Sequence, residues 1–396
     1  MLRLYRHWLL LALMASVACA AGCSAIASYY AGEAGPVADG STPDASFDAR
    51  AQPPLDGPLD GAVTDQLEDL PSAEPSATDT TGDRSKVTIV DTLADMPRPP
   101  DDAGSVSGFV VCGGANNAWC QPTQRPTTYA LRGIWGRSAR DVYAVGDAGT
   151  ILHYDGSSWT PMPSGVGVQL NAVFGVGNKV YAVGNSGTIL ELDTTNSWQS
   201  MTSGTTQSLW SVWASPVGVY VVGNTQIRAL QPNRTWADET PANSFSLTLT
   251  AVFGEGTTVM AVGTDSSVGV TLVRQGNGSW TQTFVGGYHR ALWMSGGEGF
   301  LAGKTGVSQP KFLHNAGSGA FGDVFISGVG SPNGVFGRGP SDVFIVGDGG
   351  NLWRYSGGTA ATAASSGVVD NLYALWAVGN HVFIVGAAGL VMHTDK

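Results

Sequence analysis

Side chains that could do chemistry are few in this sequence and widely spaced. Between residues 106 and 396 the histidines are His153, His289, His314, His381 and His393. Metal and catalytic sites bring such residues together at characteristic spacings, and these five show no such spacing. We therefore interpret each as a half-buried strand or turn residue, and we expect no catalytic residue, no metal ion and no cofactor.

Six residues are candidates for contact with a ligand, because the repeat described below places them in loops on one rim. They are Asp147, Asn185, Asp348, Tyr288, His289 and Arg290. The first three stand at equivalent turn positions of their units. Aspartate and asparagine also tolerate turn geometry, so a structural role is the alternative for these three. The other three form the only aromatic and basic cluster among the predicted loops, which are the usual place for binding residues.

A repeat of about 40 residues positions these loops. An apolar residue and an aromatic residue open each of seven units, at Ile134-Trp135, Val173-Phe174, Val212-Trp213, Val252-Phe253, Leu292-Trp293, Val335-Phe336 and Leu375-Trp376. A second run ends in glycine, as in VYAVG, a third follows in most units, and a fourth begins with tryptophan in four units. Short β-branched runs bounded by turn residues indicate strands.

Four strands in a unit cannot bury both faces of their sheet, so neighbouring units must stack. The sequence therefore predicts an all-β fold, a seven-bladed β-propeller of four-stranded antiparallel blades, over residues 106–396. The seventh unit lacks a tryptophan strand, whereas Ala118-Trp119-Cys120-Gln121-Pro122 before the first unit is similar to Ser158-Trp159-Thr160-Pro161-Met162. We expect residues 118–122 to complete the last blade and close the ring.

The N-terminus has the parts of an export signal: basic Arg3 and Arg6, an apolar run from Trp8 to about Val17, and small residues before Cys23. This pattern resembles the bacterial lipoprotein signal. The resemblance implies removal of residues 1–22, lipidation of Cys23 and, with Ser24 next, sorting to the outer membrane, facing the periplasm or the cell surface. Ordinary secretion after cleavage near Ala20 or Gly22 is the alternative, because the family usually has leucine or valine where Ala20 stands.

Residues 23–105 form a predicted disordered tether rich in Pro, Asp and Ala. Residues 24–105 hold 16 acidic and 4 basic residues, whereas residues 106–396 hold 15 and 14. So few apolar residues cannot offset the entropy lost on ordering. A short partner-binding motif at 87–93 is the alternative. The folded part is nearly neutral and has no basic patch, so we expect no nucleic acid as partner.

Cys112 and Cys120 are the cysteines left in the exported, folded part. They are close enough in sequence to pair, and exported proteins favour disulfides. We predict a disulfide that clamps the approach to the closing strand. A metal site is the weaker alternative, because the two thiols have no histidine nearby.

The repeats WG-x-x-x-x-DVYAVG-x-x-GTILHYDGSSW resemble those of bacterial secreted propellers of the YVTN/BNR-like group over about residues 118–396. This resemblance implies the fold and no particular activity. WD repeats fit less well because no Gly-His and Trp-Asp signatures recur, and kelch repeats are longer. Sialidase-like enzymes carry S-x-D-x-G-x-x-W turns, but Asp155-Gly156-Ser157-Ser158-Trp159 is one residue short of that pattern.

The function that we predict is a noncatalytic, envelope-anchored binding or scaffold propeller. Its partner would be an envelope protein or a glycan, it would meet the membrane through its lipid alone, and we expect a monomer. A carbohydrate-active hydrolase or lectin of the sialidase/BNR-like type is the alternative. It would need arginines converging at the axis, and Arg132, Arg137 and Arg140 all belong to the first unit.

Anchoring depends on Cys23 if the signal is that of a lipoprotein. Cys23→Ser removes the acceptor thiol, so we expect the protein to move from the membrane fraction to the soluble fraction, as measured by fractionation and immunoblotting. The matched control is Ser24→Ala, which keeps the cysteine. Retention of Cys23→Ser in membranes would point to another means of attachment.

Overall fold

The computed structural model describes residues 119–122, 124–242, 246–306, 309–317 and 319–395. The signal segment, Cys23, the tether and Cys112 lie outside the described residues. Their predicted roles, including the disulfide between Cys112 and Cys120, therefore stay predictions. No helix in the described part is long and apolar enough to cross a membrane.

The described chain is built from antiparallel meanders of short strands, which we call blades 1 to 7 in chain order. Blades 1 to 3 are β1 (Leu131–Ser138), β2 (Asp141–Gly146), β3 (Ile151–Tyr154) and β4 (Trp159–Pro161); β5 (Leu170–Val176), β6 (Lys179–Gly184), β7 (Ile189–Leu192) and β8 (Trp198–Met201); and β9 (Leu209–Ser215), β10 (Gly218–Gly223), β11 (Gln226–Leu230) and β12 (Trp236–Asp238).

The remaining blades follow the same plan. Blades 4 to 7 are β13 (Leu247–Glu255), β14 (Thr258–Asp265), β15 (Val268–Arg274) and β16 (Trp280–Phe284); β17 (Tyr288–Ser295), β18 (Glu298–Lys304), β19 (Pro310–Asn315) and β20 (Gly322–Ile326); β21 (Pro332–Gly339), β22 (Asp342–Gly347), β23 (Leu352–Tyr355) and β24 (Ala360–Ala364); and β25 (Leu372–Val378), β26 (His381–Gly386) and β27 (Val391–Thr394). Short 3-10 turns η2 (Asp147–Gly149), η3 (Asn185–Gly187), η4 (Asp348–Gly350) and η5 (Ala387–Gly389) join the second and third strands of four blades.

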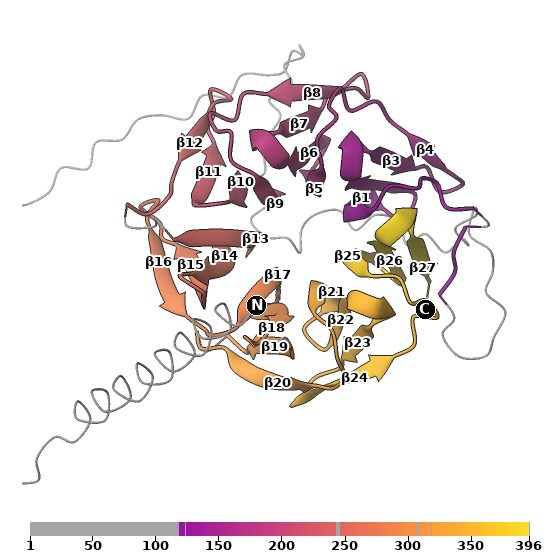
Figure 1. Cartoon of the computed structure of the whole chain (residues 1–396). Helices are drawn as coiled ribbons and strands as arrows, with labels where there is room; N and C mark the ends of the chain where they lie inside the picture. The colour runs from indigo at the N-terminus through magenta and orange to yellow at the C-terminus, as the bar shows by residue number, and fades with distance from the viewer. Residues whose placement is uncertain (1–118, 123, 243–245, 307–308, 318, 396) are drawn as a thin grey trace, which may run out of the picture. The chain divides into compact units, whose positions relative to one another are not determined.

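The blades stand around a central axis, with the first strand of each innermost (Figure 1). Each inner strand contacts that of the next blade, and β25 contacts β1, so the ring is closed. The prediction of a β-propeller is therefore confirmed. The second strand of a blade is buried along nearly its whole length, as in β2, β6 and β26, because a neighbouring blade covers each face.

Blades 5 and 6 differ from the predicted separate four-stranded sheets. Their outer strands β20 and β24 pair in parallel at Phe325 with Ala360 and Ile326 with Ala361, which makes one eight-stranded sheet. These two units lack the tryptophan that opens the outer strand in blades 1 to 4. The count of seven blades rests on dividing this joined sheet into its two meanders.

The aromatic residue of each inner strand alternates between tryptophan and phenylalanine from one blade to the next. Tryptophan stands in blades 1, 3, 5 and 7, and phenylalanine stands in blades 2, 4 and 6. The ring centroids of Phe174 and Phe253 are 5.8 Å apart, and those of Phe253 and Phe336 are 6.1 Å apart. Three phenylalanines from non-adjacent blades therefore meet across the axis.

Each tryptophan ring reaches a glycine on the next blade. A Cβ atom placed on that glycine would lie within 2.9 Å of the ring, for the pairs Trp135 and Gly175, Trp213 and Gly254, Trp293 and Gly337, and Trp376 and Gly136. Real Cβ contacts are longer, so a side chain there would overpack the contact. Where the preceding blade carries the smaller phenylalanine, the equivalent residues are Ala214, Met294 and Ala377.

Residues before β1 contact blade 7. Cys120 forms an antiparallel bridge with His393 through backbone hydrogen bonds of 2.8 and 2.9 Å. The indole of Trp119 packs edge-on against Phe344 of the neighbouring blade 6, and the guanidinium of Arg125 donates to both carboxylate oxygens of Asp370, just before β25, at 3.0 and 3.1 Å. These contacts support the hypothesis that residues 118–122 complete the last blade.

Closure can be tested by comparing two deletions in thermal unfolding. Deleting 106–125 would expose the edge of β27 and the apolar surface under Trp119. At about 25 cal/mol per Å² we expect a loss of several kcal/mol and a midpoint lower by many degrees, or aggregation. Deleting 24–104 is the control and should leave the midpoint unchanged. Equal midpoints for the two truncated proteins would contradict the closure hypothesis.

Candidate functional site: the axis mouth and its rim

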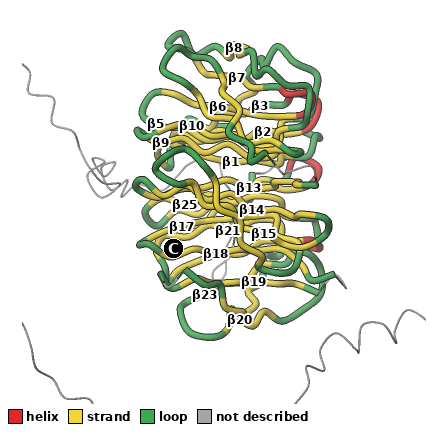
Figure 2. The backbone as a smooth tube through the Cα atoms, turned by 90° about the vertical axis from the view of Figure 1, so that its left-hand side faces the viewer, coloured by secondary structure: helices red, strands yellow, loops and turns green. Residues whose placement is uncertain are grey.

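The propeller has two different rims. One carries the turns between second and third strands and the connections between blades, and we call it the connection rim. The other carries the turns between first and second and between third and fourth strands, and we call it the hairpin rim. Figure 2 shows the 3-10 turns gathered on one side of the ring, which is the connection rim.

Asp147, Asn185 and Asp348 lie on the connection rim, as the first residues of η2, η3 and η4. Each turn continues through a residue with positive φ, and the carbonyl of its first residue accepts the backbone N–H three positions later. Their side chains are also engaged. Asp147 pairs with Arg132, whereas Asn185 and Asp348 accept hydrogen bonds of 3.1 and 2.8 Å from Asn171 and Asn333.

The partners of these turn residues belong to a ring of bulged positions. In every blade the register between first and second strand skips one residue near the connection rim. An unpaired bulge residue bends the strand and redirects its side chain. The skipped residues, in blade order, are Arg132, Asn171, Trp210, Thr250, Arg290, Asn333 and Tyr373. Because they stand on the inner strands, they surround the axis at this rim.

The bulge residues of blades 2, 4 and 6 hold adjacent blades together. The side chains of Asn171, Thr250 and Asn333 donate to the carbonyls of Leu209, His289 and Leu372, at 2.7, 2.7 and 3.0 Å. Each accepting carbonyl belongs to the residue just before the next bulge. Removing one of these side chains would leave a carbonyl between the blades without its donor, which destabilises the fold. A structural role therefore accounts for these three side chains.

The bulge residues of blades 1, 3, 5 and 7 are larger, and we call these four, Arg132, Trp210, Arg290 and Tyr373, the axis-mouth residues. The guanidinium of Arg132 stacks over the ring of Tyr373, 5.3 Å from its centroid. The indole N–H of Trp210 donates to Asn224 at 2.9 Å, and Arg290 donates to the side-chain oxygen of Asn333 at 2.7 Å. Within the described residues, none of these four side chains donates a hydrogen bond to a backbone carbonyl of the next blade. They present two guanidinium groups and two aromatic rings around the axis.

The predicted cluster at 288–290 is split by the fold. Arg290 is exposed and Tyr288 is half-buried, but His289 is only 1% exposed. Burial lowers the pKa of His289 to about 4, and its Nε2–H donates to the carbonyl of Gly286 at 2.6 Å. His289 is therefore a neutral core residue at neutral pH, and Arg290 is the member of the cluster best placed to meet a ligand.

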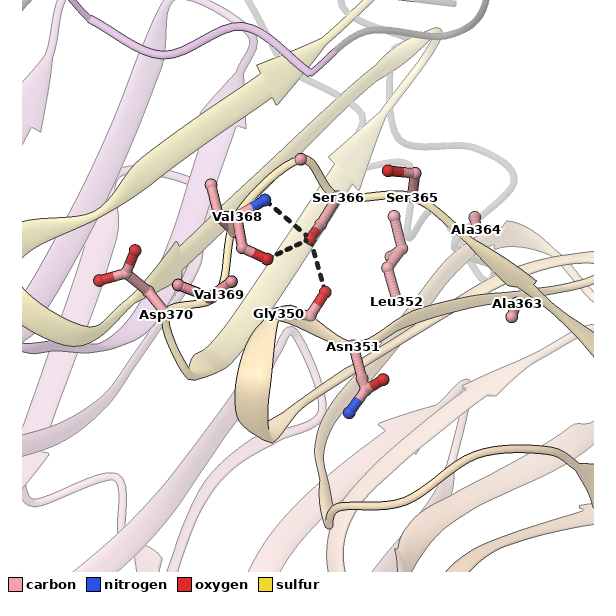
Figure 3. A pocket seen from close by; sticks show the side chains of 11 residues that line it. Gly350, Asn351, Leu352, Ala363, Ala364, Ser365, Ser366, Val368, Val369 and Asp370 are labelled. Atoms are coloured by element: carbon pink, nitrogen blue, oxygen red, sulfur yellow. Dashed lines mark hydrogen bonds between the residues drawn. The ribbon is translucent and has the colours of Figure 1, made fainter.

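A hollow of about 490 Å³ on the connection rim lies between η4 and the connection from β24 to β25 (Figure 3). The Ser366 hydroxyl lies in its lining, donating to the carbonyl of Gly350 at 2.5 Å and accepting from the N–H of Val368 at 3.3 Å. Ser164 and Ser203 accept equivalent bonds in blades 1 and 2. The serine is thus a recurring feature of the connections between blades.

The axis-mouth residues other than Arg290 are missing from the sequence prediction, although the repeat contains a signal for them. The residue two positions before each apolar and aromatic pair is polar or aromatic in all seven units. This residue lies at the axis mouth only because a bulge in the first strand redirects its side chain, and aligning the sequences of the units does not reveal the bulge. In the described part no group of three His, Cys, Asp or Glu side chains could hold a metal ion.

The fold and rim define a β-propeller with a polar and aromatic axis mouth. No protein-family model and no curated protein sequence matches the chain. Solved propellers do match it in structure. YCF48 from Cyanidioschyzon merolae has a TM-score of 0.57 and 17% identity, over 70% of this chain and 98% of its own.

Two further structures are similar to the same extent. YCF48 bound to D1 peptide has a TM-score of 0.56 and 16% identity, over 72% of this chain and 100% of its own. The WD40 β-propeller domain of Doa1 has a TM-score of 0.56 and 11% identity, over 68% of this chain and 94% of its own. At these identities the similarity shows the fold alone.

Proposed function

We propose that the protein is a noncatalytic binding module that holds a protein partner on its connection rim. The observation that carries this proposal is the distribution of exposed apolar side chains. The large ones on this rim are Tyr129, Val268, Phe284, Val329 and Val369. Among the described residues, Val217 stands on the hairpin rim, and the backbone N–H of Phe325 donates to Thr359 in the turn between β23 and β24, which places Phe325 near that rim as well.

Exposed apolar side chains of this size indicate an interaction surface when they gather on one face. Phe284 is 64% exposed at the rim end of outer strand β16, and Val268 is 44% exposed at the start of the neighbouring strand β15. Burying them on a partner contributes free energy of association, and aromatic side chains are enriched at interface centres. One similar structure is YCF48 bound to D1 peptide, which supports a polypeptide as the kind of partner.

The attachment of the preceding segment fits this proposal. β27 runs from the connection rim to the hairpin rim, and Cys120 pairs antiparallel with His393 near the end of β27. The described chain therefore begins near the hairpin rim, and its first residues leave the connection rim accessible. With lipid on Cys23, the protein would be an exported, outer-membrane protein.

Retention of a partner from envelope extracts tests the proposal. We expect the wild-type propeller to retain a discrete protein, and Val268→Ser with Phe284→Ser to lose it, because both rim contacts become polar. Val217→Ser is the matched control, since Val217 is 55% exposed on the hairpin rim, and it should retain the protein as the wild type does. Thermal midpoints of all three must agree.

Two outcomes would contradict the proposal. One is equal retention by the rim variant and the control, which would remove the connection rim from the interaction. The other is turnover of a glycan by the purified propeller, measured as released reducing sugar, which would favour a carbohydrate-active enzyme.

A further inference from the structure

The charged side chains of the propeller are almost fully paired, and the exceptions are concentrated. Within the described ranges every lysine and arginine has a carboxylate within 4.0 Å except Arg140, Arg290 and Lys304. Arg140 lies in the turn between β1 and β2, on the hairpin rim. Arg290 and Lys304 both lie at the connection-rim end of blade 5.

Arg290 and Lys304 are close along the ladder of blade 5. Lys304 is the last residue of β18 and stands opposite Tyr288, the first residue of β17, two positions before Arg290. Arg290 donates to the neutral amide oxygen of Asn333, which leaves its charge uncompensated. The nearby Asp323 is already paired with Lys311 at 2.7 Å.

Exposed apolar side chains of the same rim stand on the neighbouring blade. Val268 and Phe284 belong to blade 4, where Phe284 pairs with Val270, two positions after Val268. Blades 4 and 5 are neighbours in the ring. A polypeptide can supply apolar side chains for this surface and carboxylates for the two cations together.

We propose that blade 5 is an anion subsite for an acidic, partly apolar segment of the partner, whose carboxylates bind Arg290 and Lys304 while its apolar side chains pack on Val268 and Phe284. This inference rests on the proposed function and specifies the chemistry of the partner. A guanidinium can take a carboxylate through two parallel hydrogen bonds, while an ammonium acts as a point charge. Arg290 is therefore the anchor of the subsite.

Binding of defined peptides tests the subsite. The probe is a fluorescein-labelled dodecapeptide of alternating glutamate and leucine, and its control has glutamine in place of glutamate. We expect Arg290→Gln with Lys304→Gln to bind the glutamate peptide about tenfold more weakly than wild type does, as expected for lost charge-assisted hydrogen bonds. Its affinity should also lose most of its salt dependence. Arg140→Gln removes an unpaired charge from the other rim and should bind as wild type does.

Equal affinity of wild type and the double variant for the glutamate peptide would overturn the subsite, as would equal affinity of wild type for both peptides. Thermal midpoints within a degree or so of wild type would exclude unfolding as the cause of weaker binding. Retention from envelope extracts separates the two proposals. A partner lost by the Val268 and Phe284 variant but kept by the Arg290 and Lys304 variant overturns the subsite alone. A partner kept by both variants overturns both.

Discussion

The contact between an inner-strand tryptophan and a glycine of the next blade is the constraint on which the rest of the ring depends. The indole fills the space where a Cβ would stand, as Trp135 does at Gly175. Phenylalanine, being smaller, admits alanine or methionine at the equivalent place. Close-packed interiors tolerate little change in volume, so these pairs fix the distance between neighbouring blades.

The alternation of tryptophan and phenylalanine also determines how the ring closes. With tryptophan in blades 1, 3, 5 and 7, two tryptophan blades must be neighbours where the chain ends meet. There Trp376 of blade 7 reaches Gly136 of blade 1. Blade 1 therefore carries both a tryptophan and the glycine that accommodates one, a combination that no other blade has.

The same alternation continues at the connection rim. Blades with phenylalanine carry short bulge residues, such as Asn171, that donate to the next blade. Blades with tryptophan carry the large axis-mouth residues. The hydrogen bonds to backbone carbonyls of the next blade thus come from the phenylalanine blades, and the larger, accessible bulge side chains come from the tryptophan blades. The bulges hold the axis-mouth residues in fixed positions before any partner arrives, which reduces the ordering cost of binding.

The sequence predicts the repeat, the strand order and the all-β fold, because apolar runs and turn residues recur with one period. Trp159, Trp198, Trp236 and Trp280 begin outer strands, as predicted. The parallel pairing of β20 with β24 could not be predicted, since it joins edges of different units that share no sequence signal. Of the anion subsite, Arg290 is among the residues predicted from the sequence, whereas Lys304 and the unpaired state of both cations are not. Most arginines here are paired, and a sequence does not show that Arg290 lacks a carboxylate while Arg132 has Asp147.

The most direct test of the packing account is a double-mutant cycle on Trp135 and Gly175, with the free energy of unfolding measured in urea. A Cβ on Gly175 would also lie 2.6 Å from the carbonyl oxygen of Lys179, so the cycle separates the ring from the backbone. Gly175→Ala should cost about 1 to 3 kcal/mol in the wild type and much less beside Trp135→Phe, whose ring is shorter. The same cost in both backgrounds would show that the carbonyl of Lys179, and not the indole, excludes a side chain at position 175. That result would contradict the claim that tryptophan and glycine fix the spacing of the blades.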